Sequence, residues 1–323
     1  MKKSFLLLIA AVALLMLYAT FQIFPFSELL EILLNIPVQL FAAYIGVSML
    51  IFALLVLRWR TINKQHGIYI PYSTLFAYRC AGFAVSFITP GPRVGGEPVR
   101  AALMTRNNVD MPHAMSSVIA DKTNELLSFG TMFIIALLVT LIISPLPRTV
   151  QLVFGIIALF MLFLVTYAII HILRGDDPVL KIFKLFRLHK IRALKKYEGS
   201  LQKFEKSIHG FYGDKPLYFW KAFAYSSVAW AVSLIEFYLV LLMIGVEPTL
   251  PYIFLVYTLV GAAYMLPIPL ALGTLEAGQT GLFIALGLAA AGGAAVAMIT
   301  RARDLMWTTI GFIVLGYYGI KKK

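Results

Sequence analysis

The chain alternates long apolar runs with short polar connections. Several of these runs have the length, about 20 residues, that a helix needs to cross the hydrocarbon core of a bilayer. They are approximately Phe5–Phe24, Ile36–Leu57, His113–Ile143, Val150–Leu173, Leu217–Ile244 and Ala294–Ile320. The pattern predicts an all-α polytopic membrane protein.

Two shorter apolar runs each end in a break rich in proline and glycine. Tyr72–Ile88 leads into the run TPGPRVGGEPVR, residues 89–100, where prolines and glycines end one helix and delay the next until Pro98. A helix continued across the membrane would carry Arg93, Arg100 and Arg106 outside. A hairpin that turns near the midplane and returns along Pro98–Met104 brings Arg106 back to the cytoplasmic face, so we predict a re-entrant hairpin.

The second break, PIPLALGTLE at residues 267–276, has the same form. Each break contains Pro-x-Pro, then glycine, then a glutamate that opens a short helix, and a polar helix follows. The matching residues are Pro90, Pro92, Gly96, Glu97 and Asp121 in the first, and Pro267, Pro269, Gly273, Glu276 and Asp304 in the second. An odd number of crossings separates the hairpins, so they open from opposite sides. We therefore predict an inverted repeat of about eight helical segments with a binding site near the midplane; the alternative for each break is a proline kink in an ordinary span.

The chain is expected to form one integral membrane domain over residues 1–323. Its parts are two N-terminal spans (1–71), a first repeat with a re-entrant hairpin (72–143), a basic cytoplasmic loop (174–216) and a second repeat with a re-entrant hairpin (251–320).

Charge gives the expected orientation. Charged residues make up 13% of the chain, about half of the usual share in soluble domains, and the net charge is +13. Lys2 and Lys3 precede the first run, which we interpret as a signal anchor, and Arg58, Arg60 and Lys64 follow the second, whereas the predicted outside loop 25–35 has no Lys or Arg. The positive-inside rule thus predicts a multi-pass protein of the cell membrane with both termini in the cytoplasm.

The basic loop has two interpretations of equal weight. Apolar residues such as Leu180, Phe183, Leu201 and Phe204 recur among its lysines and arginines at helical spacing. It is either a set of amphipathic helices on anionic cytoplasmic lipid or a plain solvated loop.

The first break predicts an anion site. Backbone N–H groups around Gly95 and Gly96 open a helix beside Arg93 and Arg100, and both features favour a phosphate group. Glu97 at the same end can accept from those N–H groups, pair with an arginine or bind a cationic headgroup; we expect it to pair with Arg100, one turn away. The alternative is a purely structural pair.

Other membrane-depth charges extend this candidate substrate-binding site. Asp121 and Glu125 share a helical face and would repel each other if both were ionised. Three roles are open for this pair: it caps the site from a neighbouring helix, holds a proton, or lies at the cytoplasmic interface. Arg301 and Asp304, one turn apart, are expected to pair. Glu236 lies alone in an apolar run, and Glu276 opens the second short helix.

No motif for a cofactor or a metal is found. The histidines are scattered, Cys80 is the single cysteine, and no P-loop, dinucleotide fingerprint or nucleophile elbow occurs. Asp176-Asp177-Pro178 is better explained as a helix start. We therefore predict no catalytic residue, no metal, no cofactor and no nucleic-acid partner.

The runs TPGPRVGGEPVRAALM, IADKTNELL and PIPLALGTLEAG resemble the transmembrane, flippase-like region of the lysylphosphatidylglycerol synthase family, over nearly the whole chain. The resemblance implies about eight helical segments with re-entrant hairpins, and translocation of a lipid between leaflets. By the motif match, the family's functional positions correspond to Pro90, Gly95, Gly96, Glu97, Arg100 and Glu276 of this chain, and Asp121 is a looser match. The second break departs from the richer glycine run usual in the family. Full-length synthases also carry a soluble aminoacyl-transfer domain, for which we expect no counterpart after Lys323.

These observations favour a translocator of an anionic or polyprenyl-phosphate type of lipid. The alternative is a membrane transferase in lipid-linked glycan or aminoacyl-lipid metabolism that depends on a membrane enzyme partner. An ion-coupled solute transporter ranks third. The sequence predicts neither the lipid nor an oligomeric state.

Overall fold

The computed structural model describes residues 26–89, 95–143, 148–174, 216–266 and 268–320, and the elements within them are helices. The longer ones are α2 (Phe26–Leu34), α3 (Val38–Gln65), α4 (Tyr72–Ile88), α5 (Glu97–Met104), α6 (Met111–Ile143), α7 (Arg148–Arg174), α11 (Pro216–Met243), α12 (Leu250–Met265), α13 (Thr274–Ala285) and α14 (Ala290–Ile320). Short 3-10 turns, η1 (Thr105–Asn107) and η3 (Pro269–Ala271), follow α5 and precede α13.

Four stretches of the described helices are long and apolar enough to cross a membrane. They are Val38–Gln65, Met111–Ile143, Gln151–His171 and Leu217–Met243. Helix α7 is the most exposed: Leu152, Ile156, Phe160 and Phe163 all face outward, as expected of a helix in contact with lipid. The protein is thus an all-helical membrane protein, as the sequence predicts; the run Phe5–Phe24 lies outside the described residues.

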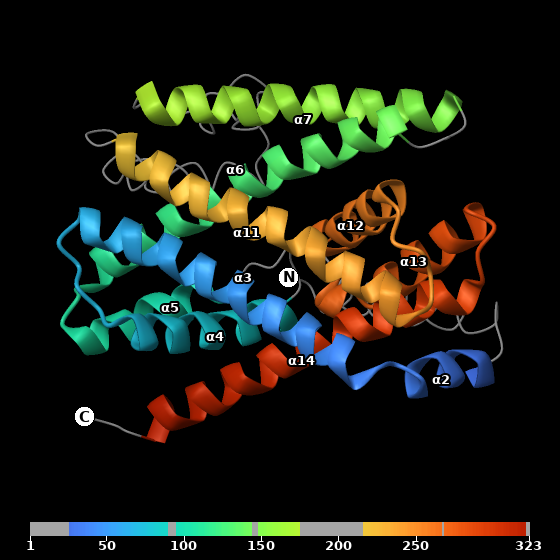
Figure 1. Ribbon diagram of the computed structural model, residues 1–323. Helices are drawn as coiled ribbons and strands as arrows, with labels where there is room; N and C mark the ends of the chain where they lie inside the picture. The colour runs from blue at the N-terminus through green and yellow to red at the C-terminus, as the bar shows by residue number, and fades with distance from the viewer. Residues whose placement is uncertain (1–25, 90–94, 144–147, 175–215, 267, 321–323) are drawn as a thin grey trace, which may run out of the picture.

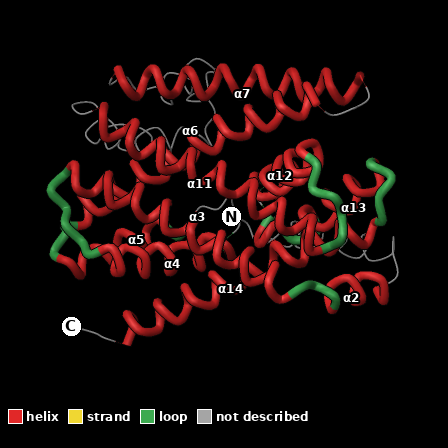
Figure 2. The backbone as a smooth tube through the Cα atoms, viewed as in Figure 1, coloured by secondary structure: helices red, strands yellow, loops and turns green. Residues whose placement is uncertain are grey.

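The long helices α3, α6, α7, α11 and α14 extend between the same two ends of the bundle, with α3 and α11 crossing α6 and α14 at an angle (Figure 1). Helix α3 packs against α11, α4 packs against α14, and α7 lies over α6. The α4–α5 hairpin joins its neighbours through loops 66–71 and 105–110 at one end of the bundle, whereas the α12–α13 hairpin does so through loops 244–249 and 286–289 at the other end (Figure 2). The helix–break–helix order predicted for both repeats is therefore present, and the two hairpins enter the bundle from opposite ends.

The N-terminal part departs from the prediction. The stretch 25–35, expected to be an outside loop, contains helix α2, with Leu29 buried and Phe26 and Leu34 exposed. Its leucines, glutamates and isoleucine are adequate helix formers, and no glycine or proline interrupts Phe26–Leu34. The absence of Lys and Arg, from which an outside loop was predicted, does not exclude a helix. The basic block 174–216 lies largely outside the described residues.

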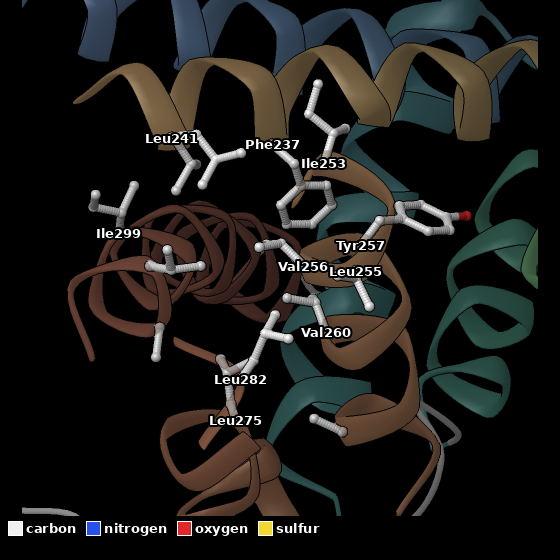
Figure 3. Close-up of a cluster of buried hydrophobic side chains, with 14 of the residues drawn as sticks. Phe237, Leu241, Ile253, Leu255, Val256, Tyr257, Val260, Leu275, Leu282 and Ile299 are labelled. Atoms are coloured by element: carbon white, nitrogen blue, oxygen red, sulfur yellow. The ribbon is translucent and has the colours of Figure 1, made fainter. Parts of the chain in front are cut away.

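A large apolar core surrounds the second hairpin (Figure 3). Most of its side chains come from α11, α12, α13 and α14, with Tyr44 of α3 and Ala136 of α6. They include Phe237, Leu241, Ile253, Leu255, Val256, Tyr257, Val260, Leu275, Leu282 and Ile299. Because lipid tails are as apolar as these side chains, close packing contributes more here than removal from water.

Glycines allow the helix backbones to approach closely. A Cβ atom on Gly293 of α14 would overlap the backbone of Gln279 in α13, and one on Gly311 would overlap the Cys80 carbonyl of α4. Small residues at such crossings are typical of membrane helix pairs. They hold α13 and α4 against the same helix, α14.

Candidate functional site

Three arginines from three helices surround Asp121. The Asp121 carboxylate is fully buried in α6; Arg58 Nε of α3 donates to Oδ1 at 2.7 Å, and Arg100 Nη2 of α5 donates to Oδ2 at 2.6 Å. Arg79 Nη1 of α4 lies 3.3 Å from Oδ2. A buried carboxylate is tolerated only when its charge is matched in this way. Asp121 therefore ties both arms of the first hairpin to α3 and α6.

Glu125, one turn further along α6, shares these arginines. Its Oε2 accepts from Arg58 Nη2 at 2.8 Å and Arg79 Nη2 at 2.9 Å, and Lys122 Nζ donates to Oε1 at 3.0 Å. The expected repulsion between Asp121 and Glu125 is thus offset by cations from neighbouring helices. We call the set Arg58, Arg79, Glu97, Arg100, Asp121, Lys122 and Glu125 the first charged cluster.

The predicted Glu97–Arg100 pair is wrong. Arg100 directs its guanidinium to Asp121, and its Cζ lies 3.8 Å from the centre of the Trp59 ring. Glu97 Oε2 instead accepts from its own loop, the Gly95 N–H, at 2.7 Å, and Oε1 lies 3.9 Å from Lys122 Nζ. Arg100 binds the buried Asp121 carboxylate, which needs several cations, in place of Glu97 one turn away.

The backbone donors at the first break are also occupied. The Gly95 N–H binds Glu97, and the Gly96 N–H donates to Ser86 Oγ at 2.9 Å. These two donors, expected to bind an anion, instead stabilise the break, so an anion at this site would meet side chains. Arg93 lies outside the described residues.

Gly82 and Gly96 bring α4 and α5 together. A Cβ on Gly96 would overlap the Gly82 carbonyl group, and a Cβ on Gly82 would meet the Arg100 side chain at 2.5 Å. Gly95 has φ of +133°, a conformation that favours glycine. The glycines therefore let the Arg100 side chain pass directly over α4 to reach Asp121.

Glu276 and Arg301 clamp the second break. Arg301 Nε binds Glu276 Oε1 and Nη2 binds Oε2 at 2.9 Å, while Nη1 donates to the Leu270 carbonyl at 2.7 Å. The Gly273 N–H donates to Glu276 Oε2 at 2.9 Å, matching the bond from Gly95 to Glu97 in the first break. The predicted Arg301–Asp304 pair is wrong, because the break offers Arg301 two backbone carbonyls and a carboxylate together.

Asp304 belongs to a separate second charged cluster, formed by Tyr264, Glu236, Arg303 and Asp304. Arg303 Nη1 donates to Glu236 Oε2 at 2.6 Å, and Nη2 donates to Asp304 Oδ1 at 2.9 Å. The Tyr264 hydroxyl donates to Asp304 Oδ2. Glu236, for which the sequence named no partner, is thus paired across helices with Arg303.

A cavity of about 190 Å³ reaches both clusters. Its charged lining comes from Arg79, Glu97, Arg100, Lys122 and Glu125 of the first cluster and from Glu236, Arg303 and Asp304 of the second. Aromatic side chains lie between them, notably Phe52, Phe83, Phe129, Trp230 and Trp307. Apolar walls with a few convergent polar groups are typical of small-molecule sites.

The predicted site residues divide into those that line the cavity and those that lie outside it. Glu97, Arg100, Glu125, Glu236 and Asp304 line it, and Asp121 lies behind its arginines. Gly95, Gly96, Glu276 and Arg301 shape the two breaks instead. Among the described residues, no group of three His, Cys, Asp or Glu side chains is placed to hold a metal ion.

Sequence reasoning missed Arg58, Arg79, Lys122 and Arg303 as parts of the site. Arg58 was interpreted as a cytoplasmic orientation signal, yet it is fully buried. The one usable signal was Arg79, a cation inside the apolar run 72–88, where an ionisable group is usually functional.

Comparisons with known proteins agree with this architecture. The model of the family described as "Lysylphosphatidylglycerol synthase TM region" matches residues 5–311. The chain is 24% identical over 293 residues to a UPF0104 membrane protein of Methanothermobacter thermautotrophicus, covering 88% of this chain and 86% of that protein. It is 23% identical over 284 residues to a UPF0104 membrane protein of Pyrococcus horikoshii, covering 83% of each. Because the family match includes both broken hairpins and both charged clusters, this chain belongs to the lysylphosphatidylglycerol synthase transmembrane-region family.

Proposed function

We propose that the protein moves an anionic or phosphate-linked lipid between the leaflets of the cell membrane, with both chain termini in the cytoplasm. The observation that carries the proposal is the cavity between the two hairpins, where cationic side chains meet an apolar and aromatic wall. Guanidinium groups offer paired donors that suit phosphate oxygens. The apolar wall suits the part of the lipid next to its tails.

The proposal takes α4–α5 and α12–α13 as re-entrant hairpins of an inverted repeat. Helices α4, α5, α12 and α13 have 17, 8, 16 and 12 residues. At a rise of about 1.5 Å per residue, each is shorter than the hydrocarbon core of about 30 Å. Their entry from opposite ends of the bundle supports turns near the midplane, where paired broken helices of transporters form their sites (Figure 2).

In this function the arginines hold the phosphate while the tails remain in the bilayer. Arg79 and Arg100 line the cavity; Asp121, behind them, binds both, and Glu125, which also lines the cavity, binds Arg79. The two carboxylates keep the guanidinium groups in place when no lipid is bound. A lipid phosphate therefore binds cations that are already oriented, which lowers the entropy cost of binding.

The test is leaflet exchange by the purified chain in proteoliposomes, measured with tail-labelled lipids and an impermeant quencher. Wild-type protein is expected to exchange a phosphate-bearing lipid. Arg100→Ala, judged folded by its elution profile, is expected to lower the exchange rate by at least about tenfold, since one charge-assisted bond contributes about 1.5–3 kcal/mol.

Arg106→Ala is the matched control, because Arg106 lies on the same hairpin but outside the cavity lining and contacts Tyr318. Equal loss in both variants would remove the assignment of Arg100 to the lipid path. Product formation from a lipid-linked donor by the purified chain, without exchange, would instead support a membrane transferase.

A further inference from the structure

The two ends of the cavity carry opposite excess charge. Among the described lining residues, the first cluster contributes three cations, Arg79, Arg100 and Lys122, against two carboxylates. Arg58 and Asp121 behind them cancel as formal charges. The second cluster contributes Arg303 against two carboxylates, Glu236 and Asp304. One end is therefore positive and the other negative.

Both ends also hold buried polar atoms that lack hydrogen-bond partners within the described residues. At the positive end these are Arg79 Nε and Arg100 Nε, on side chains of residues only 8% and 6% exposed. At the negative end it is Glu236 Oε1, on a residue 3% exposed. Leaving such atoms unpaired costs free energy, so they indicate a ligand that supplies acceptors at one end and donors at the other.

The wall near the negative end also suits a cation. Trp307 lies one turn after Asp304 in α14 and lines the cavity. It stacks on Phe52 with ring centres 4.1 Å apart, and the Phe52 ring centre also lies 5.6 Å from Arg79 Cζ of the positive end. The Trp307 Nε1–H donates to Ser48 Oγ at 2.9 Å, which fixes the indole ring. Aromatic faces attract ammonium groups, most strongly in places shielded from water.

From this arrangement we infer that the bound headgroup is zwitterionic, with a phosphate against Arg79 and Arg100 and an ammonium group against Glu236 and the Trp307 ring. The inference rests on the proposed function and names the headgroup class. The cavity of about 190 Å³ has room for a compact headgroup. A purely anionic headgroup leaves Glu236 Oε1 unpaired.

Calorimetric titration of the full chain in detergent tests the inference. The probes are short-chain phosphatidylethanolamine, phosphatidylglycerol and N-acetylated phosphatidylethanolamine, which keeps the phosphate but has no ammonium group. We expect phosphatidylethanolamine to bind at least about tenfold more tightly than either of the others, because only it pairs both cavity ends. Equal or tighter binding of phosphatidylglycerol would overturn the inference.

Glu236→Gln tests the ammonium end. Glutamine keeps an acceptor for Arg303 but removes the charge, so the preference over the N-acetylated lipid should fall to about one. Glu247→Gln, in the exposed loop before α12, is the matched control and should keep the preference. A preference retained in folded Glu236→Gln contradicts the assignment; if that variant does not fold, the comparison of lipids on the wild-type chain decides.

Two further arms separate the inference from the proposed function. Tail-free glycerophosphoethanolamine should bind more weakly than the lipid, and equal affinity would make the ligand a soluble solute and overturn the lipid assignment. Selective binding without leaflet exchange would refute translocation and leave the headgroup class standing. Exchange with no preference for phosphatidylethanolamine would refute the headgroup class alone.

Discussion

Asp121 joins three arginines in the first charged cluster. It is fully buried and accepts from Arg58, Arg79 and Arg100, each on a different helix. Removing one member of a buried ionic network leaves the others uncompensated, which is more costly than never having built it. The residue thus has a structural role as well as a role in orienting cations toward the cavity.

We predict that Asp121→Asn destabilises the protein by about 3–5 kcal/mol and lowers its Tm in detergent by several degrees. Asp110→Asn is the control, because the Asp110 side chain is 59% exposed and its carboxylate bonds to His113 at the surface. Thermal unfolding followed by tryptophan fluorescence measures both. An unchanged Tm in Asp121→Asn would contradict the described network.

Arg301 has a structural role that is confined to the second break. It binds Glu276 and the carbonyls of Leu270 and Ala271, residues with φ of +57° and +50°. Such backbone conformations cost about 1–3 kcal/mol each and need support from their surroundings. We interpret Arg301 as the support of the second break.

Arg301→Lys should therefore lower the Tm by a few degrees, because a lysine cannot replace the fork of donors that reaches both carbonyls and the carboxylate. The relative affinities for different headgroups should stay the same, since Arg301 is outside the cavity lining. Titration of the purified variant checks the second point. A changed headgroup preference at an unchanged Tm would show that Arg301 contacts the lipid.

At the scale of elements, the first hairpin depends on contact between two glycines. Gly96→Ala would place a Cβ into the Gly82 carbonyl, and since both groups are backbone, the α4–α5 pair must separate. We predict a lower Tm and loss of the exchange that depends on Arg100. Gly46→Ala is the control: it lies in helix α3 with nothing within 4 Å of the added Cβ, so alanine should be neutral or slightly stabilising. Normal stability of Gly96→Ala would contradict the close approach.

The opposite entry of the hairpins gives a topology prediction. On a Cys80→Ala background, a cysteine replacing Asp110 should react with an impermeant thiol reagent only from the cytoplasmic side, and one replacing Glu247 only from outside. Both positions lie in exposed loops at opposite ends of the bundle. Labelling of both from the same side would break the inverted repeat.

Helix boundaries were largely predictable, whereas side-chain pairing was not. The predicted run Tyr72–Ile88 coincides with α4, and the runs for α6, α7 and α11 differ from the observed helices by only a few residues. Hydropathy, proline and glycine act locally, so the sequence reveals them. Arg58 and Asp121 are 63 positions apart, and Arg303 and Glu236 are 67 apart, so only the packed bundle brings them together. The sequence therefore found the carboxylates and Arg100 but assigned the wrong partners.

At the scale of the whole molecule, the segments around the two breaks contribute unequal charge to one cavity. Both breaks use a glycine N–H bound to a glutamate, but the first places its arginine into the cavity and the second uses its arginine to hold the break. This asymmetry gives the cavity a positive end and a negative end. Under the proposed function, a cavity with unequal ends would orient a headgroup as it passes between the leaflets.

The most direct test of the proposed lipid translocation is the rate of leaflet exchange for tail-labelled phosphatidylethanolamine. It is measured in sealed proteoliposomes that contain only the purified chain. The account predicts exchange well above that of protein-free vesicles, and slower exchange of the N-acetylated lipid under the same conditions. Exchange no faster than in protein-free vesicles, for these lipids and for phosphatidylglycerol, would contradict it.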